Sequence, residues 1–200
     1  MSSPPSRRAV LATATLVAVA AGLVALFGQR WLQAPPPDTV TIGAPFALTA
    51  SDGRTVTDAD YRGRYMLVTF GFTHCPDVCP TTLAAVATAL DRLGDKADRV
   101  QPILITVDPE RDTPAVLAAY VQAFHPRLIG LTGGTAEIEA LVAAYRVYAE
   151  KAAPDATGDY QVDHTAAVFL MDPDGRFLTL FSSTLDAEAL AAGLNQYVDG

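Results

Sequence analysis

Two short apolar runs with an amphipathic segment between them constrain the fold of this sequence more than any other feature. The runs are Tyr65–Phe70 and Gln101–Val107. Each is long enough for a strand buried on both faces and too short for a stable helix. Between them, apolar residues recur at helical spacing up to Gly94, a residue type common at helix ends. These residues are Leu83, Val86, Leu90 and Leu93. The pattern predicts two strands at the centre of an α/β sheet.

The segments around this unit add a hairpin and two more helices. Phe46–Thr57 holds a turn at Ser51-Asp52-Gly53 between extended pieces, which predicts a small hairpin. A second helix is expected to begin with Thr113 as its cap and Pro114 in its first turn. Its predicted inward residues are Val116, Leu117, Tyr120, Val121 and Phe124. A third helix, expected to be capped by Thr135, carries Ile138, Leu141, Val142 and Tyr145.

The end of the chain completes the pattern. Strands are expected at Ala166–Met171 and Phe177–Phe181, joined by a tight turn at Asp172–Gly175. A last helix carries Leu190, Leu194, Tyr197 and Val198. Lys151–Asp163, between the third helix and these strands, is polar and contains glycine, so a loop is expected there. The order of elements is similar to the thioredoxin-like fold. We therefore predict an α/β domain over residues 43–200, a mixed central sheet flanked by helices with an N-terminal hairpin extension.

The N-terminal residues indicate a membrane anchor. Arg7 and Arg8 precede the uncharged run Ala9–Phe27, which as a helix would be about 29 Å long, close to the thickness of a bilayer's hydrocarbon core. We expect a cytoplasmic N-terminus at residues 1–8, one transmembrane signal-anchor at 9–28 and a Pro-rich linker at 29–42. A cleaved secretory signal is the alternative, with Ala18–Ala20 as the cleavage site. These features favour a bacterial inner-membrane protein with a single span, whose domain faces the periplasm.

The charge balance argues against one class of partner. The chain has 14 basic and 22 acidic side chains and a net charge of −8. The first 28 residues contain two arginines and no acidic residue, so the rest of the chain is more acidic still. Such a surface repels phosphate backbones, and we expect no nucleic-acid binding.

The chain has two cysteines, Cys75 and Cys79, directly after the first central strand. Ligands of open α/β sheets bind at the carboxyl ends of the strands. A spacing of four would place both sulfurs on one face of a first helical turn, close enough for a disulfide or a shared metal. Amides at the helix start would favour the thiolate. An inert disulfide is the alternative, although a loop of three residues gains little from cross-linking.

Two enzyme classes resemble this segment imperfectly. Dithiol exchangers of the thioredoxin type have two residues between their cysteines, whereas three separate Cys75 from Cys79. They also carry a cis-proline where this chain has Ala166. Peroxiredoxins have a threonine at the position that Pro76 occupies here. The sequence therefore disfavours both enzymatic analogies.

The three histidines differ in their expected roles. His125 follows the second helix and is expected on the surface, and His74 is expected to line a wall or cap a turn. His164 follows the polar loop and precedes the strand at 166–171, near the edge where the cysteines are expected. Two thiolates and an imidazole favour copper(I) and permit copper(II), and zinc is a competitor. Three protein ligands leave a coordination position open.

Three segments together carry a resemblance to a known family. They are Gly71–Pro80 (GFTHCPDVCP), Val107–Pro114 (VDPERDTP) and Asp163–Thr165 with the turn Asp172–Gly175. Over residues 43–198 the chain is similar to the Sco family of copper proteins, which includes SenC and PrrC. The resemblance implies a membrane-anchored thioredoxin-like domain that binds copper through Cys75, Cys79 and His164. It also implies a role in maturing the CuA centre of cytochrome c oxidase subunit II.

The resemblance leaves several roles open. The leading hypothesis is a copper chaperone, loaded by a periplasmic copper donor, rather than an enzyme. A thiol-disulfide reductase that keeps the oxidase cysteines reduced would use Cys75 and Cys79 as a redox pair and would have little need of His164. A redox or copper sensor is a third hypothesis. Asp163 is expected to accept a hydrogen bond from the ring of His164. Asp108–Asp112 is expected to form a strand-to-helix turn rather than to bind the metal.

Overall fold

We describe the protein from a computed structural model that places residues 41–198. The cytoplasmic segment predicted at 1–8, the transmembrane helix at 9–28 and the linker up to residue 40 lie outside the described residues. Within residues 41–198 no helix combines the length and the apolar character that crossing a bilayer requires.

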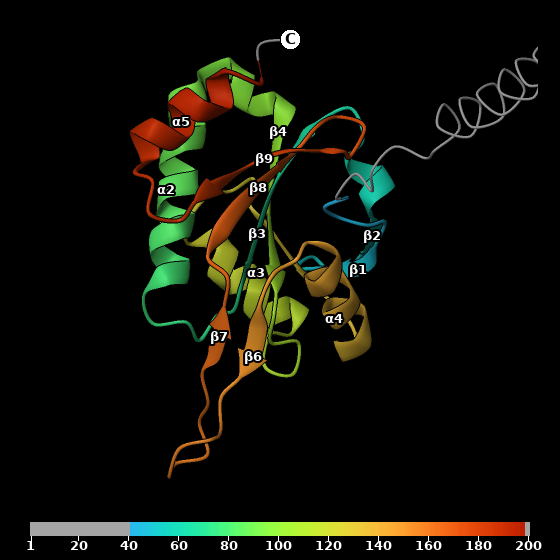
Figure 1. Cartoon of the computed structure of the whole chain (residues 1–200), viewed down its shortest axis with the longest axis vertical. Coiled ribbons are helices and arrows are strands. Elements are labelled where there is room, and N and C mark those ends of the chain that lie inside the picture. Colours follow the sequence, from blue (N-terminus) through green and yellow to red (C-terminus); the bar gives the residue numbers. More distant parts are fainter. Residues whose placement is uncertain (1–40, 199–200) are drawn as a thin grey trace, which may run out of the picture. The chain divides into compact units, whose positions relative to one another are not determined.

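A seven-stranded mixed sheet forms the centre of the described domain (Figure 1). Its strands are β1 (Ala47–Ala50), β2 (Thr55–Thr57), β3 (Tyr65–Gly71), β4 (Val100–Thr106), β5 (Ile129–Thr132), β8 (Ala167–Met171) and β9 (Phe177–Ser182). Across the sheet their order is β2-β1-β5-β4-β3-β8-β9. Strands β5, β4 and β3 run parallel, and the other neighbours pair antiparallel. The predicted thioredoxin-type α/β sheet is confirmed, with the hairpin β1–β2 at one edge.

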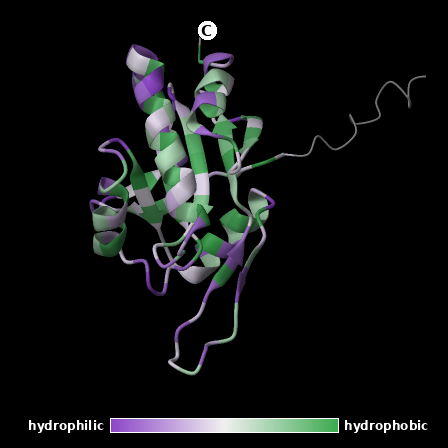
Figure 2. Ribbon diagram, turned by 90° about the vertical axis from the view of Figure 1, so that its left-hand side faces the viewer, coloured by the Kyte–Doolittle hydropathy of each residue, from purple (hydrophilic) through white to green (hydrophobic). Residues whose placement is uncertain are grey.

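Helices cover both faces of this sheet. They are α2 (Val78–Leu93), α3 (Pro114–Gln122), α4 (Thr135–Ala144) and α5 (Ala187–Asn195), with 3-10 turns η1 (Asp58–Tyr61) and η2 (Gly94–Arg99). All seven residues of both β3 and β4 are buried. One face packs against α4 and η1, and the other packs against α2, α3 and α5. The apolar colouring therefore concentrates on the strands and on the inner sides of the helices (Figure 2).

The helices follow the predicted signals except in their last residues, one cap and one inward residue. Residues Phe124, Tyr145, Tyr197 and Val198 were assigned to helices, but α3 ends at Gln122, α4 at Ala144 and α5 at Asn195, so these residues lie just beyond the helices. The Thr113 hydroxyl accepts a hydrogen bond from the Val116 amide at 3.3 Å and caps α3, as predicted. Val116 was expected to point inward but is 38% exposed, because it lies on the outer side of the first turn of α3. Thr135 was expected to cap α4, but the cap is Gly134, and Thr135 is the first helical residue.

Two features were not predicted. Strand β5 completes the parallel part of the sheet between α3 and α4. The expected loop at 151–163 is present at 152–161, but it joins the strands of a second, two-stranded sheet that was not predicted, β6 (Ala149–Lys151) and β7 (Val162–His164). This hairpin extends beyond the main sheet at the end opposite α5 (Figure 1). It carries His164, so it decides where the third predicted metal ligand lies.

The turn between β8 and β9 offers a stability test. Burial raises the pKa of Asp172, but hydrogen bonds from the backbone and the guanidinium of Arg176 outweigh burial and hold it below its ordinary value. A lowered folded-state pKa contributes stability above the unfolded pKa of about 4, and this stability is lost as the pH falls through the folded value. We expect Asp172→Asn to cost about 1 kcal/mol of unfolding free energy at pH 7 and less below pH 4.

Urea unfolding at pH 7 and at pH 3 measures this difference. The control is Asp174→Asn at the same turn, because the Asp174 side chain is 73% exposed. It should change the unfolding free energy by less than about 0.5 kcal/mol. An equal loss for both variants, or the same Asp172→Asn loss at both pH values, would contradict the assigned role of Asp172.

Candidate metal centre

The carboxyl end of β3 leads directly into the two cysteines. Gly71 is the last residue of β3, and a β-carbon added to it would lie 2.7 Å from Cys79 Sγ. Real β-carbons are essentially never found so close to another heavy atom. Glycine at this position therefore lets the Cys79 sulfur pack against the end of the central strand.

The cysteines lie on two different elements rather than on one helical turn. Cys79 is in the first turn of α2, whereas Cys75 precedes the helix and its cap Asp77. The prediction that both sulfurs share one face of a helical turn was wrong in this respect, because α2 starts at Val78. The sulfurs nevertheless lie within 4.8 Å of one another, and the Cys79 amide donates a hydrogen bond to Cys75 Sγ at 3.4 Å. Both cysteines are buried free thiols.

The β6–β7 hairpin brings His164 to these sulfurs across 85 residues of sequence. His164 Nε2 lies 3.2 Å from Cys79 Sγ. The other ring nitrogen, Nδ1, lies 3.1 Å from the carbonyl oxygen of Val162. The ring also packs against Phe72, edge to face, with 5.6 Å between the centroids. The Nδ1 contact orients the imidazole so that Nε2 points at the sulfur.

Asp163 does not take the predicted role. It was expected to accept a hydrogen bond from the His164 ring, but that position is taken by the Val162 carbonyl oxygen. Asp163 is exposed and pairs in register with Glu150 on β6. Alternate residues of a strand point to opposite faces, so neighbouring residues Asp163 and His164 face different sides of the hairpin.

The three ligand atoms of Cys75, Cys79 and His164 all lie within 4.8 Å of one another. Two sulfurs and one imidazole nitrogen make a donor set suited to a soft or borderline metal ion. The site therefore fits copper(I), and it also fits the competitor zinc, which takes the same donors. The structure thus brings together all three residues that the sequence singled out as ligands.

The site lies between a small inner cavity and an open hollow. Cys79 and His164 line an inner cavity of about 10 Å³, which has room for about one water molecule. Cys75, Asp77 and His164 border an outer hollow of about 320 Å³ that reaches the surface. A metal ion held by the three ligands could therefore be approached by another protein's side chain through the outer hollow.

The protonation of Cys79 differs from the sequence-based expectation. Amides at the start of α2 were expected to favour the thiolate, but burial raises the pKa of the Cys79 thiol, and a hydrogen bond that its protonated form makes to Cys75 adds to the increase. Desolvation disfavours the charged form more strongly than the helix start favours it. A soft metal cation would reverse this balance, because metal binding displaces the thiol proton.

The other two histidines lie outside the ligand set, as expected. His74 is exposed, and its Nδ1 is 3.1 Å from the Thr73 hydroxyl. His125 accepts a hydrogen bond from the Arg127 amide at 3.1 Å, and its Nε2 is 3.6 Å from Asp91. Although half-buried rather than on the surface, His125 belongs to a local polar contact beyond the end of α3.

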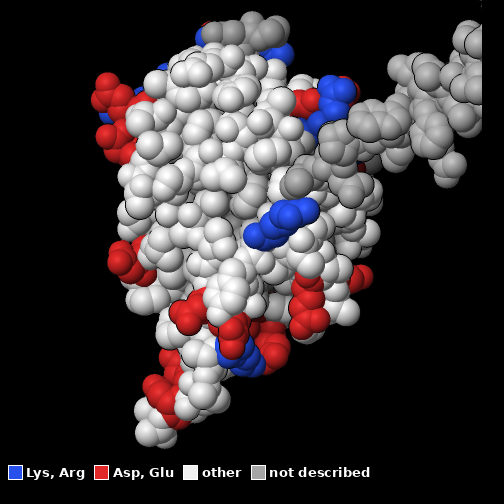
Figure 3. Space-filling model, in the orientation of Figure 1, with Lys and Arg blue, Asp and Glu red and all other residues white. Residues whose placement is uncertain are grey.

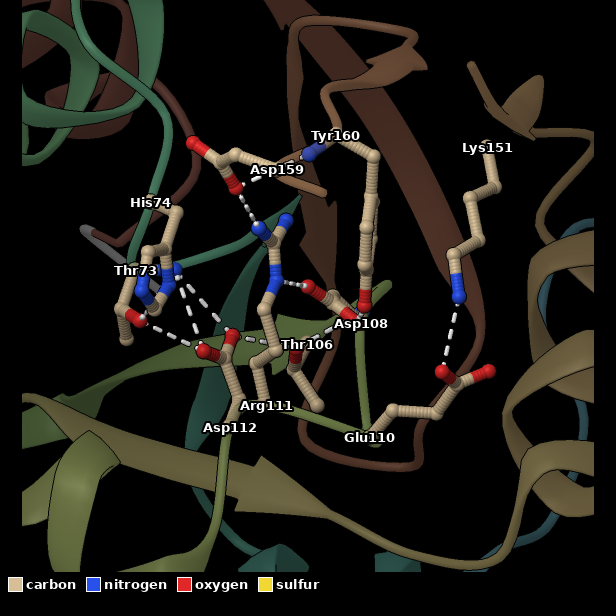
Figure 4. A network of polar contacts seen from close by, with 10 residues as sticks. All are labelled: Thr73, His74, Thr106, Asp108, Glu110, Arg111, Asp112, Lys151, Asp159 and Tyr160. Carbon is tan, nitrogen blue, oxygen red and sulfur yellow. Dashed lines mark hydrogen bonds and ion pairs between the residues drawn. The ribbon is translucent and has the colours of Figure 1, made fainter. Parts of the chain in front are cut away.

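A buried carboxyl group supports the cysteine loop, and the sequence assigned it only to a turn. Asp112 is fully buried and accepts hydrogen bonds from the Thr73 amide at 3.1 Å and the Thr106 hydroxyl at 2.6 Å (Figure 4). It also accepts one from the Thr73 hydroxyl at 2.5 Å. Asp112 thereby ties the loop that leads to Cys75 to the end of β4. The predicted strand-to-helix turn at 108–112 is confirmed, but its support of the metal site came only from the structure.

Comparison with known proteins agrees with this geometry. A family model described as SCO1/SenC matches residues 34–199. The human protein "Protein SCO1 homolog, mitochondrial" is 42% identical over 155 residues, covering 76% of this chain and 52% of the human protein. "Protein SCO1 homolog 1, mitochondrial" from Arabidopsis thaliana is 40% identical over 163 residues, covering 81% of this chain and 48% of that protein. The chain thus spans about half the length of these curated relatives.

Solved structures of relatives share the fold. The copper-bound structure of Bradyrhizobium japonicum ScoI superposes with a TM-score of 0.73 at 49% identity, covering 78% of this chain and 99% of that one. Copper-bound Arabidopsis thaliana ScoI has a TM-score of 0.73 at 41% identity, with the same two coverages. The family match covers most of the sequence, including every element that builds the site. The chain therefore belongs to the SCO1/SenC family.

Proposed function

We propose that this protein is a membrane-anchored copper chaperone that binds copper(I) through Cys75, Cys79 and His164 and delivers it to the CuA centre of cytochrome c oxidase subunit II. The observation that carries the proposal is the convergence of two sulfurs and one imidazole nitrogen within 4.8 Å. Relatives solved with copper bound support copper as the metal. Another solved relative, BsSco, is a member of the Sco family of cytochrome c oxidase assembly proteins, and membership of the same family supports the oxidase as the partner here.

Delivery would proceed by ligand exchange. Three protein ligands leave copper(I) with an open position, so a thiolate of the acceptor can bind before the ligands of the donor leave. Cys75 and His164 border the outer hollow, whereas Cys79 lies against the inner cavity. An acceptor thiolate that enters the hollow would meet the metal on the side of Cys75. Cys79 would hold the ion until the transfer is complete.

The proposed location rests on the sequence of the N-terminal segment. Residues 9–28 would anchor the chain in a bacterial inner membrane, and the acidic domain would face the periplasm. A periplasmic copper donor would load the site there. Acidic side chains gather around the end of the described domain that carries the β6–β7 hairpin (Figure 3). A loading or accepting protein with basic side chains around its metal site would complement this end.

A thiol-disulfide reductase is the second candidate. The separation of the Cys75 and Cys79 sulfurs, which lie within 4.8 Å of one another, favours it, because a modest movement would let oxidation pair them. Such an enzyme would reduce the CuA cysteines of the oxidase subunit before metal insertion. It would need both thiols but no third metal ligand.

A transfer assay distinguishes the two candidates. The purified full chain, reduced and loaded with copper(I), is mixed with a reduced, metal-free CuA domain of subunit II, and copper on each protein is measured after separation. We expect copper to move to the CuA domain from the wild-type protein. In a parallel assay, the copper-free chain is mixed with a CuA domain whose cysteines are oxidised to a disulfide, with His164→Ala alongside.

The outcomes of these two assays distinguish the chaperone from the reductase. Copper transfer by the wild-type protein, with weaker copper loading of His164→Ala, supports the chaperone. Failure of the reduced chain to retain copper, together with equal disulfide reduction by wild type and His164→Ala, contradicts the chaperone and favours the reductase. Zinc retained in preference to copper(I) would contradict the choice of metal.

A further inference from the structure

The hairpin that carries His164 is not part of the main sheet. Among the described strands, β6 and β7 pair only with each other. Backbone hydrogen bonds of the seven-stranded sheet therefore do not hold the imidazole in place. Some other set of contacts must fix the hairpin against the body of the domain.

Tyr160, two residues before β7, makes the central contact. Its hydroxyl donates a hydrogen bond to Asp108 at 2.8 Å, across 52 residues of sequence. The guanidinium carbon of Arg111 lies 3.7 Å from the centre of the Tyr160 ring, and the Lys151 ammonium lies 3.9 Å from it. Cations at these distances from an aromatic face are attracted to it. The ring of Tyr160 is thus held at its edge and at its face.

Arg111 joins the hairpin to the body of the domain. Its Nε donates to Asp108, and its Nη1 donates to Asp159 on the hairpin at 2.8 Å. Its guanidinium carbon also lies 5.8 Å from the centre of the Phe72 ring, which itself packs on His164. Figure 4 shows Arg111 between Asp108 on one side and Asp159 on the other. A single side chain therefore contacts the hairpin and the aromatic support of its metal ligand.

The same framework reaches the cysteine loop. Asp108 is 3% exposed, and its amide donates to the Thr106 hydroxyl at 2.9 Å. The Thr106 hydroxyl donates in turn to Asp112, which holds Thr73 two residues before Cys75. One continuous polar framework thus supports both the loop that carries the cysteines and the hairpin that carries the histidine (Figure 4).

We propose that Asp108, Arg111 and Tyr160 form a latch that positions His164 as the third metal ligand, and this inference rests on the proposed copper site. With the latch closed, the imidazole stays against Cys79. When the latch opens, the hairpin moves away and the ion keeps only its two sulfur ligands. The latch therefore sets how long the protein retains copper. These three side chains are positioning residues and do not contact the metal.

The test compares latch variants with a matched control. Arg111→Gln removes the cation, and Tyr160→Phe removes only the hydrogen bond to Asp108 while keeping the ring. The control is Arg176→Gln at the β8–β9 turn, which removes an arginine that also donates to an aspartate, Asp172, at 2.8 Å but whose side chain is 74% exposed. All are made in the full chain, and copper(I) affinity is measured by competition with a chelator.

Replacing a residue that holds a metal ligand in position typically changes the metal affinity 10- to 100-fold. We expect Arg111→Gln to weaken copper(I) binding about tenfold, Tyr160→Phe to weaken it less, and Arg176→Gln to change it less than twofold. In a His164→Ala background, Arg111→Gln should cause no further loss, because the latch acts through His164. A tenfold loss that persists without His164, or an equal effect of the Arg176→Gln control, would overturn the latch.

A second readout does not require copper. Cys79 is 5% exposed, and His164 of the hairpin lies 3.2 Å from its sulfur, so the rate at which a thiol reagent modifies Cys79 reports hairpin opening in the reduced, metal-free protein. We expect Arg111→Gln to accelerate this modification about tenfold and to leave hydrogen exchange of the β3 and β4 amides unchanged. An unchanged modification rate overturns the latch. Loss of copper binding by the wild type, with faster Cys79 modification in the variant, would instead overturn the proposed function and leave the positioning of the hairpin standing.

Discussion

Replacing Cys79 with serine is expected to lower copper(I) affinity about 100- to 1,000-fold. Structural zinc sites gain about 10–16 kcal/mol from four ligands, or about 2.5–4 kcal/mol per ligand, and we apply that scale to one thiolate. A serine hydroxyl is a hard donor that does not replace a thiolate toward copper(I). Chelator competition with the reduced protein measures the change. Affinity within tenfold of the wild type would show that Cys79 is not a ligand.

Gly71→Ala is the matched control for this prediction. It leaves all three ligands in the chain but places a β-carbon 2.7 Å from Cys79 Sγ, so the sulfur must move. Because that atom ends a short side chain that can rotate, the fold should survive. We expect a loss of affinity smaller than that of Cys79→Ser. Urea unfolding of both metal-free variants checks that neither loss reflects an unfolded protein.

Replacing Asp112 with alanine is expected to cost about 3 kcal/mol of unfolding free energy, a large share of the stability of a typical domain. The fully buried Asp112 carboxyl group accepts three hydrogen bonds, two from Thr73 and one from Thr106. Its removal leaves the buried Thr106 hydroxyl and the partly buried Thr73 donors without this acceptor and also leaves a cavity. Urea unfolding of the reduced, metal-free protein measures the loss.

Two further variants serve as comparisons for the stability loss expected of Asp112→Ala. Asp112→Asn keeps one acceptor oxygen and should lose less stability than Asp112→Ala. Asp163→Ala removes an exposed carboxyl group beside the metal ligand and should cost less than about 0.5 kcal/mol. A loss below about 1 kcal/mol for Asp112→Ala would contradict its role as the support of the cysteine loop.

The central part of the fold was predictable because its sequence signals are local. The apolar runs that form β3 and β4 are buried along their whole length, so their apolar composition matches the buried environment of every residue in them. Helix α2 ends at Gly94 and α3 begins with Thr113 and Pro114, and each boundary follows from the conformational preference of those residues. The position of the cysteines after β3 followed from the same reasoning.

The short and polar elements were not predictable in the same way. Strand β5 has four residues, one of them Gly130, where a β-carbon would meet Leu117 at 2.9 Å. Glycine weakens the strand pattern, although close packing against α3 requires it here. Strands β6 and β7 have three residues each and are largely polar, so no periodicity distinguishes them from a loop.

The supporting contacts of the metal site depend on tertiary structure. Tyr160 meets Asp108 and Arg111 only because the hairpin folds back over the turn after β4. The hydrogen-bond partner of the His164 ring is a backbone carbonyl, which carries no sequence signal. The raised pKa of Cys79 follows from burial, whereas the helix start visible in the sequence predicted the opposite direction. The sequence thus singled out the three residues that the structure brings together, but not the contacts that hold them.

X-ray absorption at the copper edge tests the central claim most directly, because it counts the sulfur and nitrogen ligands of the bound ion. The reduced full chain is loaded with one equivalent of copper(I), and His164→Ala is measured alongside. We predict two sulfur ligands and one imidazole nitrogen in the wild type, and two sulfur ligands without that imidazole in the variant. Identical spectra for the two proteins, or a site with fewer than two sulfurs, would contradict a copper centre built from Cys75, Cys79 and His164.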